Sequence, residues 1–159
     1  MNRPPHQHQM NTDELCLRFD GGSRGNPGPA AIGLTISAPD GKTIYELGEF
    51  IGRATNNVAE YTALVRGAQA ARRLGVKKLR ILADSELVVR QITGVYRVKS
   101  PDLRPLYMQA LAELRTIPKW SIEHVYREDN SRADALANMA MDIQGKVEPV
   151  APEANRATA

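Results

Sequence analysis

The sequence predicts a single α/β domain in which a five-stranded mixed sheet is flanked by helices. Three observations lead to this prediction. Apolar and polar residues alternate over residues 15–20, as in a strand that buries one face, and residues 30–38 and 43–51 form two more predicted strands around a turn. From residue 57 onward the apolar spacing becomes helical, and strands then alternate with helices. A chain of 159 residues is also long enough to form one core, burying roughly two thirds of its unfolded surface.

The first strand is predicted over residues 15–19 and ends at Asp20. Its apolar side chains take alternate positions: Leu15, Leu17 and Phe19. Successive side chains of a strand point to opposite faces, so Asp20 is expected on the face away from this trio. Residues 21–29 are rich in glycine and proline, which predicts a loop rather than the interior of a strand. Asp20 should therefore stand at the mouth of a loop that offers many backbone groups.

The later elements follow from changes in the apolar pattern. Two further strands are joined by a Pro-Asp-Gly-Lys sequence, which is typical of a hairpin turn. In chain order we expect strands over 30–38 and 43–51, a helix over 57–73, a strand over 77–83, helices over 85–93 and 101–115, a strand over 120–127 and a helix over 131–143. This order, βββαβααβα, predicts three antiparallel strands followed by two parallel ones with right-handed crossovers.

Residues 1–12 and 145–159 are expected to be disordered tails around a domain of residues 13–144. Both tails are rich in proline and in polar or small residues. His6 and His8 lie in the first tail, where a mobile chain offers no fixed geometry, so we expect no functional metal site there.

The cellular setting is predicted from the single cysteine and the lack of long apolar runs. Cys16 lies in the first strand, and we interpret it as a small buried hydrophobe rather than a reactive thiol. No run approaches the roughly 18 apolar residues of a membrane span, and the first residues lack the apolar stretch of a signal peptide. These features favour a cytoplasmic protein that does not interact with membranes.

Four acidic residues lie near the ends of predicted elements: Asp20, Glu60, Asp84 and Asp134. Asp20 and Asp84 each follow a strand, and open α/β sheets place their active sites at the carboxyl ends of strands. Glu60 lies one turn into the first helix, and Asp134 near the start of the last. If the fold brings the four together, they form a site for hard divalent cations.

Each acid also has a structural interpretation. Three pairs resemble helix caps: Asn57 with Glu60, Asp84 with Ser85, and Ser131 with Asp134. Asp20 could belong to an ordinary Asp-Gly turn. The ordered set of four favours the functional interpretation more than any single acid does.

Each of the four acids stands within a longer motif. The motifs are Phe19-Asp20-Gly21-Gly22-Ser23-Arg24-Gly25-Asn26-Pro27-Gly28-Pro29, Thr55-Asn56-Asn57-Val58-Ala59-Glu60, Asp84-Ser85 and Asn130-Ser131-Arg132-Ala133-Asp134. In this order they resemble type 1 ribonuclease H over about residues 14–143. The resemblance implies a ribonuclease H-like fold and identifies Asp20, Glu60, Asp84 and Asp134 as the catalytic acids and metal ligands.

The resemblance also implies a mechanism that uses two Mg²⁺ ions, with Mn²⁺ as an alternative. Ligands that are all oxygen select these ions over zinc, and a two-metal site assists the attack of water and the departure of the 3′ oxygen. By the resemblance, Asp20 bridges both ions. Glu60 and Asp84 then lie mainly on the water side, and Asp134 on the other.

The same resemblance implies two sets of substrate contacts. Gly21, Gly22, Ser23, Asn56 and Asn57 would contact 2′-hydroxyl groups, which distinguish RNA from DNA. A phosphate pocket for the DNA strand would comprise Asn26, Arg53 and Thr55, in which the guanidinium can make paired, charge-assisted hydrogen bonds. Ordinary alternatives are a turn asparagine, an exposed arginine and a threonine that simply precedes a helix.

Two regions depart from the family pattern. The basic handle of larger bacterial members is missing, and only residues 93–100 with Arg97 and Lys99 stand in its place. Binding of the hybrid should therefore be weaker and depend less steeply on salt. Arg127 resembles the auxiliary arginine of compact members, whereas His124 is interpreted as a structural histidine within a strand. Glu86 replaces a common glutamine, so no substrate contact is assigned to it.

Net charge permits a nucleic-acid substrate without requiring one. The chain carries +3, and neutralising the four acids leaves 21 basic residues against 14 acidic ones, or +7. The sequence thus predicts a monomeric endoribonuclease that cuts the RNA strand of RNA/DNA hybrids and leaves 5′-phosphate and 3′-hydroxyl ends. Alternatives are a noncatalytic hybrid-binding module, an enzyme that also cuts double-stranded RNA, and a strand-transfer or exonuclease relative.

Overall fold

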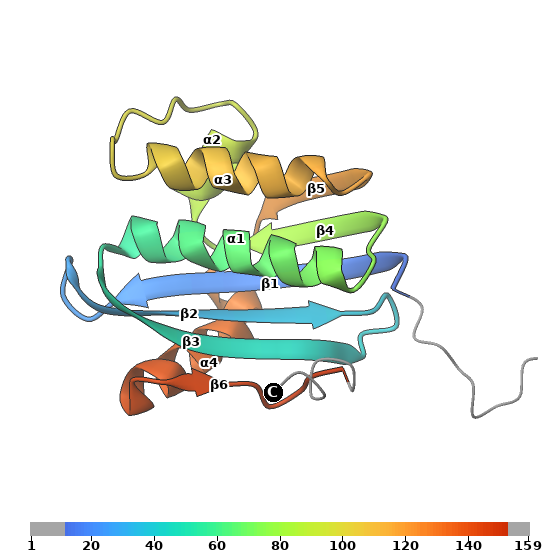
Figure 1. Cartoon of the computed structure of the whole chain (residues 1–159), viewed down its shortest axis with the longest axis horizontal. Helices are drawn as coiled ribbons and strands as arrows, with labels where there is room; N and C mark the ends of the chain where they lie inside the picture. The colour runs from blue at the N-terminus through green and yellow to red at the C-terminus, as the bar shows by residue number, and fades with distance from the viewer. Residues whose placement is uncertain (1–11, 153–159) are drawn as a thin grey trace, which may run out of the picture.

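The computed structural model describes residues 12–152 and is built around a six-stranded sheet (Figure 1). The strands lie in the order β5-β4-β1-β2-β3-β6. Their bounds are β1 Glu14–Ser23, β2 Gly28–Ser37, β3 Thr43–Ala54, β4 Lys78–Ala83, β5 Lys119–His124 and β6 Lys146–Val147. β1, β2 and β3 pair antiparallel, β4 runs parallel to β1, and β5 runs parallel to β4. The predicted mixed sheet and its order are confirmed, with one strand more than expected.

Helices cover both faces of this sheet. Their bounds are α1 Asn56–Arg73, α2 Glu86–Ile92, α3 Arg104–Arg115 and α4 Ser131–Ile143, and a short 3₁₀ helix, η2, spans Arg127–Asn130. α1 packs on β1 and β2 with α3 beside it, whereas α4 packs on β2 and β3 from the opposite side (Figure 1). No helix in the described part of the chain is long and apolar enough to cross a membrane.

The main core lies between α1 and the sheet. Leu17 and Phe19 of β1 are fully buried against it, together with Tyr61 and Leu64 of α1 and Ile81 of β4. Burying apolar area of this size is the main force that stabilises such a fold. The predicted alternation along β1 is confirmed, because Asp20 lies on the face away from the apolar trio.

α4 approaches the other face closely because glycines lie beneath it. A Cβ at Gly33 of β2 would overlap the backbone of Ala133, and one at Gly48 of β3 would overlap that of Leu136. Only a residue without a side chain allows this contact. The start of α4, which carries Asp134, is thereby fixed above the sheet.

β1 is longer than predicted, since Gly21, Gly22 and Ser23 belong to the strand rather than to a loop. β2 continues to pair with β1 through Ser23↔Ala30. This ladder satisfies the backbone groups of the glycines, so their weak strand propensity is overridden.

Strand β6 was not predicted, because residues 145–159 were expected to form a tail. Gly48 and Glu49 of β3 pair with Val147 and Lys146. Glu46 also donates its backbone N–H to the carbonyl of Val150, at 2.7 Å. This pairing covers the edge of β3, which would otherwise expose unpaired backbone groups. Residues 1–11, with His6 and His8, and residues 153–159 lie outside the described part, so the tail predictions there stay predictions.

Two smaller corrections concern the last predicted strand and Cys16. The strand predicted over 120–127 ends at His124, and the chain then turns into η2. Cys16 is half-buried rather than buried, because it faces a part of the sheet where Arg80 and Glu123 are also exposed. Burial nevertheless raises the pKa of its thiol.

Candidate active site

The candidate site begins where two parallel strands separate. The register of β1 and β4 ends with the pair Phe19↔Ala83, and the residues that follow are Asp20 and Asp84. Beyond this point β1 continues along β2, whereas the chain after β4 enters α2. The two carboxylates therefore stand side by side at a fork in the sheet, as expected for the carboxyl ends of parallel strands.

α1 brings the third carboxylate to this fork. Glu60 is only 6% exposed, and its Oε1 accepts a hydrogen bond of 2.9 Å from the backbone N–H of Gly21. A Cβ on Gly21 would overlap the backbone of Ala59, so the close approach of helix and strand requires glycine at this position. The contact places Glu60 directly beside Asp20.

The three carboxylates converge on a single point. One ligand oxygen from each of Asp20, Glu60 and Asp84 lies within 4.8 Å of the other two. Asp134, from α4, lines the same cavity of about 350 Å³. We call this cavity, lined also by Gly21, Gly22, Asn56, Ser85 and Arg127, the acidic cavity. The structure therefore brings all four sequence-predicted acids to one place.

The electrostatics of the acidic cavity disfavour ionised carboxylates in the absence of a cation. Burial, together with the negative charges of Asp84 and Asp134, raises the pKa of Asp20 to about 6. Burial and the nearby Asp20 hold the pKa of Glu60 well above its ordinary value, against the opposing hydrogen bond from Gly21. Like charges in a desolvated site repel each other, and a bound dication would remove that repulsion.

The helix caps are made by other residues. Thr55 accepts a hydrogen bond from the N–H of Val58 at the start of α1, and Ser85 accepts one from the N–H of Val88 at the start of α2. Of the predicted capping interpretations, only that of Ser85 is confirmed, and the cap of α1 is Thr55, which was expected only to precede the helix. The four acids make no side-chain cap in these helices, which leaves them available for another role.

Several predicted substrate residues lie around one end of the cavity. The N–H and hydroxyl of Ser23 donate to Oδ1 of Asn56, at 2.8 and 3.1 Å. Oδ1 of Asn26 in turn accepts from the N–H of Asn56, at 3.1 Å. The β1–β2 loop and the start of α1 are thus tied together.

Two predicted substrate residues are not drawn into this network. The side chains of Arg53 and Asn57 are exposed and form no hydrogen bond or ion pair within residues 12–152. Arg53 lies opposite Pro29 in the β2–β3 register, at the same end of the sheet as Asn26. Its guanidinium is therefore free to meet a ligand.

Comparison with known proteins identifies the family. A family model described as reverse transcriptase-like matches residues 18–140. Ribonuclease HI of Halobacterium salinarum is 49% identical over 124 residues, which is 78% of this chain and 62% of that protein. A crystal structure of RNase H1 from the same organism superposes with a TM-score of 0.80 at 47% identity, covering 82% of this chain and 98% of that one. The chain belongs to the ribonuclease H family.

Another member of the family has been solved in complex with nucleic acid. LC11-RNase H1, in complex with an RNA/DNA hybrid, is 41% identical with a TM-score of 0.78, and the match covers 82% of this chain and 98% of that one. The chain nevertheless spans less than two thirds of the length of the Halobacterium relative. These matches confirm the predicted fold and the resemblance to ribonuclease H.

The residues at which the sequence departs from the family pattern lie as follows. Arg127, in η2, lines the acidic cavity. His124 is the exposed last residue of β5, and its ring lies edge-on to Tyr126 with centroids 5.8 Å apart. Its place in a strand is confirmed, but it is not buried. Glu86 forms an ion pair of 2.7 Å with Arg90, one turn along α2.

Sequence reasoning missed one residue of the site, Asn130. It is 1% exposed and donates from Nδ2 to an Asp84 oxygen at 3.3 Å. Asn130 stands in the last sequence motif but was given no role there, because an asparagine directly before a helix has no local feature that distinguishes such a contact from an ordinary N-cap.

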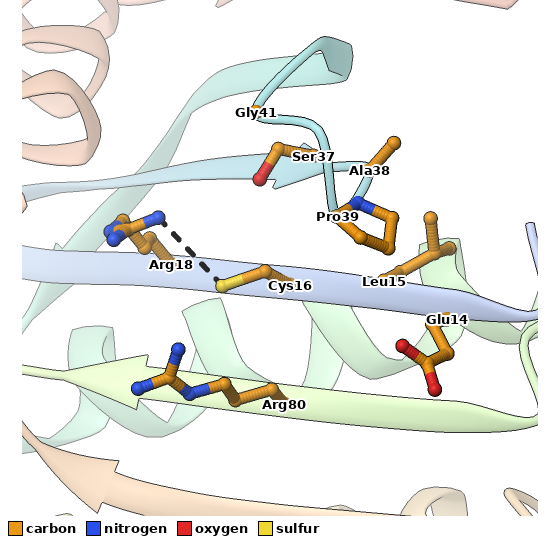
Figure 2. A pocket seen from close by; sticks show the side chains of 9 residues that line it. All are labelled: Glu14, Leu15, Cys16, Arg18, Ser37, Ala38, Pro39, Gly41 and Arg80. Atoms are coloured by element: carbon orange, nitrogen blue, oxygen red, sulfur yellow. Dashed lines mark hydrogen bonds between the residues drawn. The ribbon is translucent and has the colours of Figure 1, made fainter.

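A second cavity of about 350 Å³ opens on the same sheet face near the start of β1 (Figure 2). We call it the Cys16 hollow; its polar lining residues are Glu14, Cys16, Arg18, Ser37 and Arg80. Two of its charges are paired with neighbours: Arg80 with Glu123 at 2.7 Å, and Glu14 with Lys78 at 3.8 Å. No acidic cluster comparable to the first occurs here among the described residues.

Proposed function

We propose that this member of the ribonuclease H family is a metal-dependent endoribonuclease that hydrolyses the RNA strand of RNA/DNA hybrids. The products would carry 5′-phosphate and 3′-hydroxyl ends. The observation that carries the proposal is the convergence of Asp20, Glu60 and Asp84 within 4.8 Å of one another, with Asp134 and Arg127 lining the same cavity. The solved complex of LC11-RNase H1 with an RNA/DNA hybrid supports a hybrid as the substrate.

The residues present suit a divalent cation. Every candidate ligand is a carboxylate oxygen, the donor type that Mg²⁺ and Mn²⁺ prefer. Oε2 of Glu60 is buried and has no hydrogen-bond partner among the described residues, which is costly unless a cation or another donor meets it. Asp20, Glu60, Asp84 and Asp134 would hold the metal, and two bound ions would activate the attacking water and stabilise the leaving oxygen.

The rest of the chemistry belongs to residues that bind and orient the substrate. Gly21, Gly22, Ser23, Asn56 and Asn57 would contact the 2′-hydroxyls of the RNA strand, and the hydrogen bonds between Ser23 and Asn56 hold this surface in place. Such pre-ordering lowers the entropy lost when the substrate binds.

A second set of residues would bind the DNA strand. Asn26, Arg53 and Thr55 would take one phosphate, to which the exposed guanidinium can make two parallel hydrogen bonds. Arg127 would stabilise charge on the scissile phosphate, because arginine stays protonated and does not serve as a base at neutral pH. The first assignment is supported by Asn26, which accepts a hydrogen bond from the N–H of Asn56, and by Arg53 at the same end of the sheet. The second is supported by Arg127, which lines the acidic cavity.

The proposal also covers the enzyme's oligomeric state, location, metal ion, domain bounds and further substrates. The protein would work as a monomer in the cytoplasm, with Mg²⁺ as the physiological ion and Mn²⁺ as a substitute. Its domain would begin near residue 13 and extend beyond the predicted end at residue 144, because β6 pairs with β3. Double-stranded RNA is the further substrate to test, because Arg127, which lines the cavity, resembles the arginine of compact family members.

The test is cleavage of a labelled RNA/DNA hybrid, with double-stranded RNA and double-stranded DNA run beside it. Wild type should cut the RNA strand of the hybrid in Mg²⁺ and not in chelator. Asp84→Asn should abolish cutting, whereas Asp142→Asn, at an exposed ion pair with Arg24, should not. Binding of the hybrid without cutting in either metal would leave a hybrid-binding module instead of an enzyme.

A further inference from the structure

Asn130 does not act as the cap that its sequence position predicts. It directly precedes α4, and an asparagine there normally accepts a hydrogen bond from an N–H in the first turn. The structure contains no side-chain cap bond from this residue. Its side chain, 1% exposed, instead points back across the sheet toward the acidic cavity.

The amide of Asn130 fills the fork between β1 and β4. Nδ2 donates to the carbonyl oxygen of Phe19 at 2.8 Å and to Oδ2 of Asp84 at 3.3 Å. The β1–β4 register ends at Phe19 and Ala83, so the amide meets the two strands just where they stop pairing. One side chain therefore links β1, the residue after β4, and the start of α4.

The neighbours also fix which way this amide faces. Rotating the group by half a turn would present Oδ1 to the carbonyl of Phe19 and to the carboxylate of Asp84, and both of these are acceptors. In the observed orientation Oδ1 is buried without a partner among the described residues. A buried amide that leaves its acceptor unpaired is unusual, and its donor contacts explain why the orientation persists.

The Asp84 carboxylate depends on this contact. Asn130 is the only hydrogen-bond donor to Asp84 that the structure shows within residues 12–152. Glu60, by contrast, is held by the backbone N–H of Gly21. Without Asn130, the Asp84 side chain would be free to rotate away from Asp20 and Glu60.

From this geometry we infer that Asn130 is a positioning residue, which holds the Asp84 carboxylate where it completes the cation site with Asp20 and Glu60. It also ties α4, and thus Asp134, to the same fork. The inference rests on the proposed function only in taking the acidic cavity as a metal site. Partners that orient metal ligands are typically worth 10–100-fold in metal affinity.

The test is an Mg²⁺ titration without substrate. The chemical shift of the Gly21 backbone amide in NMR spectra reports binding, because this amide donates a hydrogen bond to Glu60. Asn130→Ala should raise the Mg²⁺ concentration at half-saturation by about tenfold or more. Asn130→Leu, which keeps a similar volume but removes the donor without adding charge, should do the same. Wild-type half-saturation in a folded variant would overturn the inference.

A matched control separates positioning from general damage to the fold. Gln91 is another buried amide, 5% exposed, and it accepts a hydrogen bond of 2.6 Å from the hydroxyl of Tyr61, away from the acidic cavity. Gln91→Ala should lower the unfolding midpoint and leave the Mg²⁺ midpoint unchanged. An equal shift of the Mg²⁺ midpoint in both proteins would also count against a positioning role.

One measurement needs no variant. In the unmodified protein, the side-chain amide signals of Asn130 should shift on adding Mg²⁺ with the same midpoint as Gly21, and signals that stay still would contradict the inference. Cleavage by Asn130→Ala should recover when Mg²⁺ is raised by the same factor as its midpoint. If wild type binds Mg²⁺ but cuts no hybrid, the proposed function fails, while the difference between wild type and Asn130→Ala still decides the positioning role.

Discussion

Two cavities of about 350 Å³ lie at opposite ends of β1, on one face of the sheet. In the Cys16 hollow, charges are balanced by neighbours, as Arg80 is by Glu123. In the acidic cavity, carboxylates of one sign converge, and burial raises the pKa of Asp20 to about 6. Cys16 and Asp20 are only about 13 Å apart along the strand. Size and the face of the sheet therefore do not distinguish the two cavities, whereas unbalanced charge does.

The difference has a structural cause. At the Cys16 end, β4 runs alongside β1 and its side chains can pair with their neighbours. At the other end the strands diverge, and α1 and α4 contribute Glu60 and Asp134, so that four acids share the cavity lining with a single arginine, Arg127. Functional sites often tolerate such locally unfavourable charge because a ligand relieves it.

The largest predicted difference is between two variants that each remove one charge, a carboxylate in the acidic cavity or a guanidinium in the Cys16 hollow. Asp20→Asn should lower the cleavage rate of a hybrid by about a thousandfold, since metal-held charge contributes several kcal/mol to the transition state. Arg80→Gln, in the Cys16 hollow, should stay within about twofold of wild type. Single-turnover kinetics would measure both, and comparable losses would erase the distinction between the cavities.

The close contact between β1 and α1 should tolerate no added methyl group. Gly21→Ala should reduce the free energy of unfolding by about 3 kcal/mol, because the new Cβ overlaps the backbone of Ala59. Gly22→Ala provides the matched control, since its nearest neighbour would be Oδ1 of Asn56 at 3.7 Å. Urea unfolding would test this pair, and equal stabilities would refute the packing explanation.

The stability of the metal-free protein should depend on pH through Asp20. Its pKa is raised from an ordinary value of 3.8 to about 6, so the protonated form favours folding. That contribution is complete below pH 3.8 and is lost as the pH rises through about 6. In chelator at pH 7.5, Asp20→Asn should therefore be more stable than wild type, by the order of 2 kcal/mol.

The control for this effect is an exposed acid. Asp142→Asn removes a surface ion pair with Arg24 and should change stability by less than about 0.5 kcal/mol. Thermal unfolding between pH 4 and 8 would measure all three proteins. A wild type that becomes more stable across this range relative to Asp20→Asn would show that the sign is wrong.

The smallest predicted effect concerns Arg53. Arg53→Ala should weaken hybrid binding by roughly tenfold, as expected for one charge-assisted contact with a phosphate. The slope of affinity against salt should fall by about one, while the rate of cutting at saturating substrate stays near that of wild type. Arg115→Ala, at the end of α3, is the control, and a similar loss there would point to nonspecific attraction.

The sequence predicted the fold well where local pattern and tertiary structure agree. The alternation before Asp20 and the helical spacing after residue 57 both describe how elements meet one core. The prediction failed where pairing between distant segments determines the secondary structure. Gly21 and Gly22 belong to a strand because β2 pairs with them, and β6 forms because it pairs with the edge of β3. Neither partner is visible in the local sequence.

The site shows the same division. The four acids could be predicted because their motifs are specific to one family, and the structure brings them together as expected. The role of Asn130 could not, because it depends on a fork between β1 and β4 that exists only after folding. Local rules assign an asparagine before a helix to capping, and only its contacts with Phe19 and Asp84 show otherwise.

The most direct test of the central claim is to locate the cation itself. Crystals of the full chain grown with Mn²⁺ should show an anomalous diffraction peak in contact with the carboxylates of Asp20, Glu60 and Asp84, and none in the Cys16 hollow. Absence of a peak between these three carboxylates at saturating Mn²⁺, or a stronger one beside Cys16, would contradict the claim that unbalanced acidic charge marks the functional cavity.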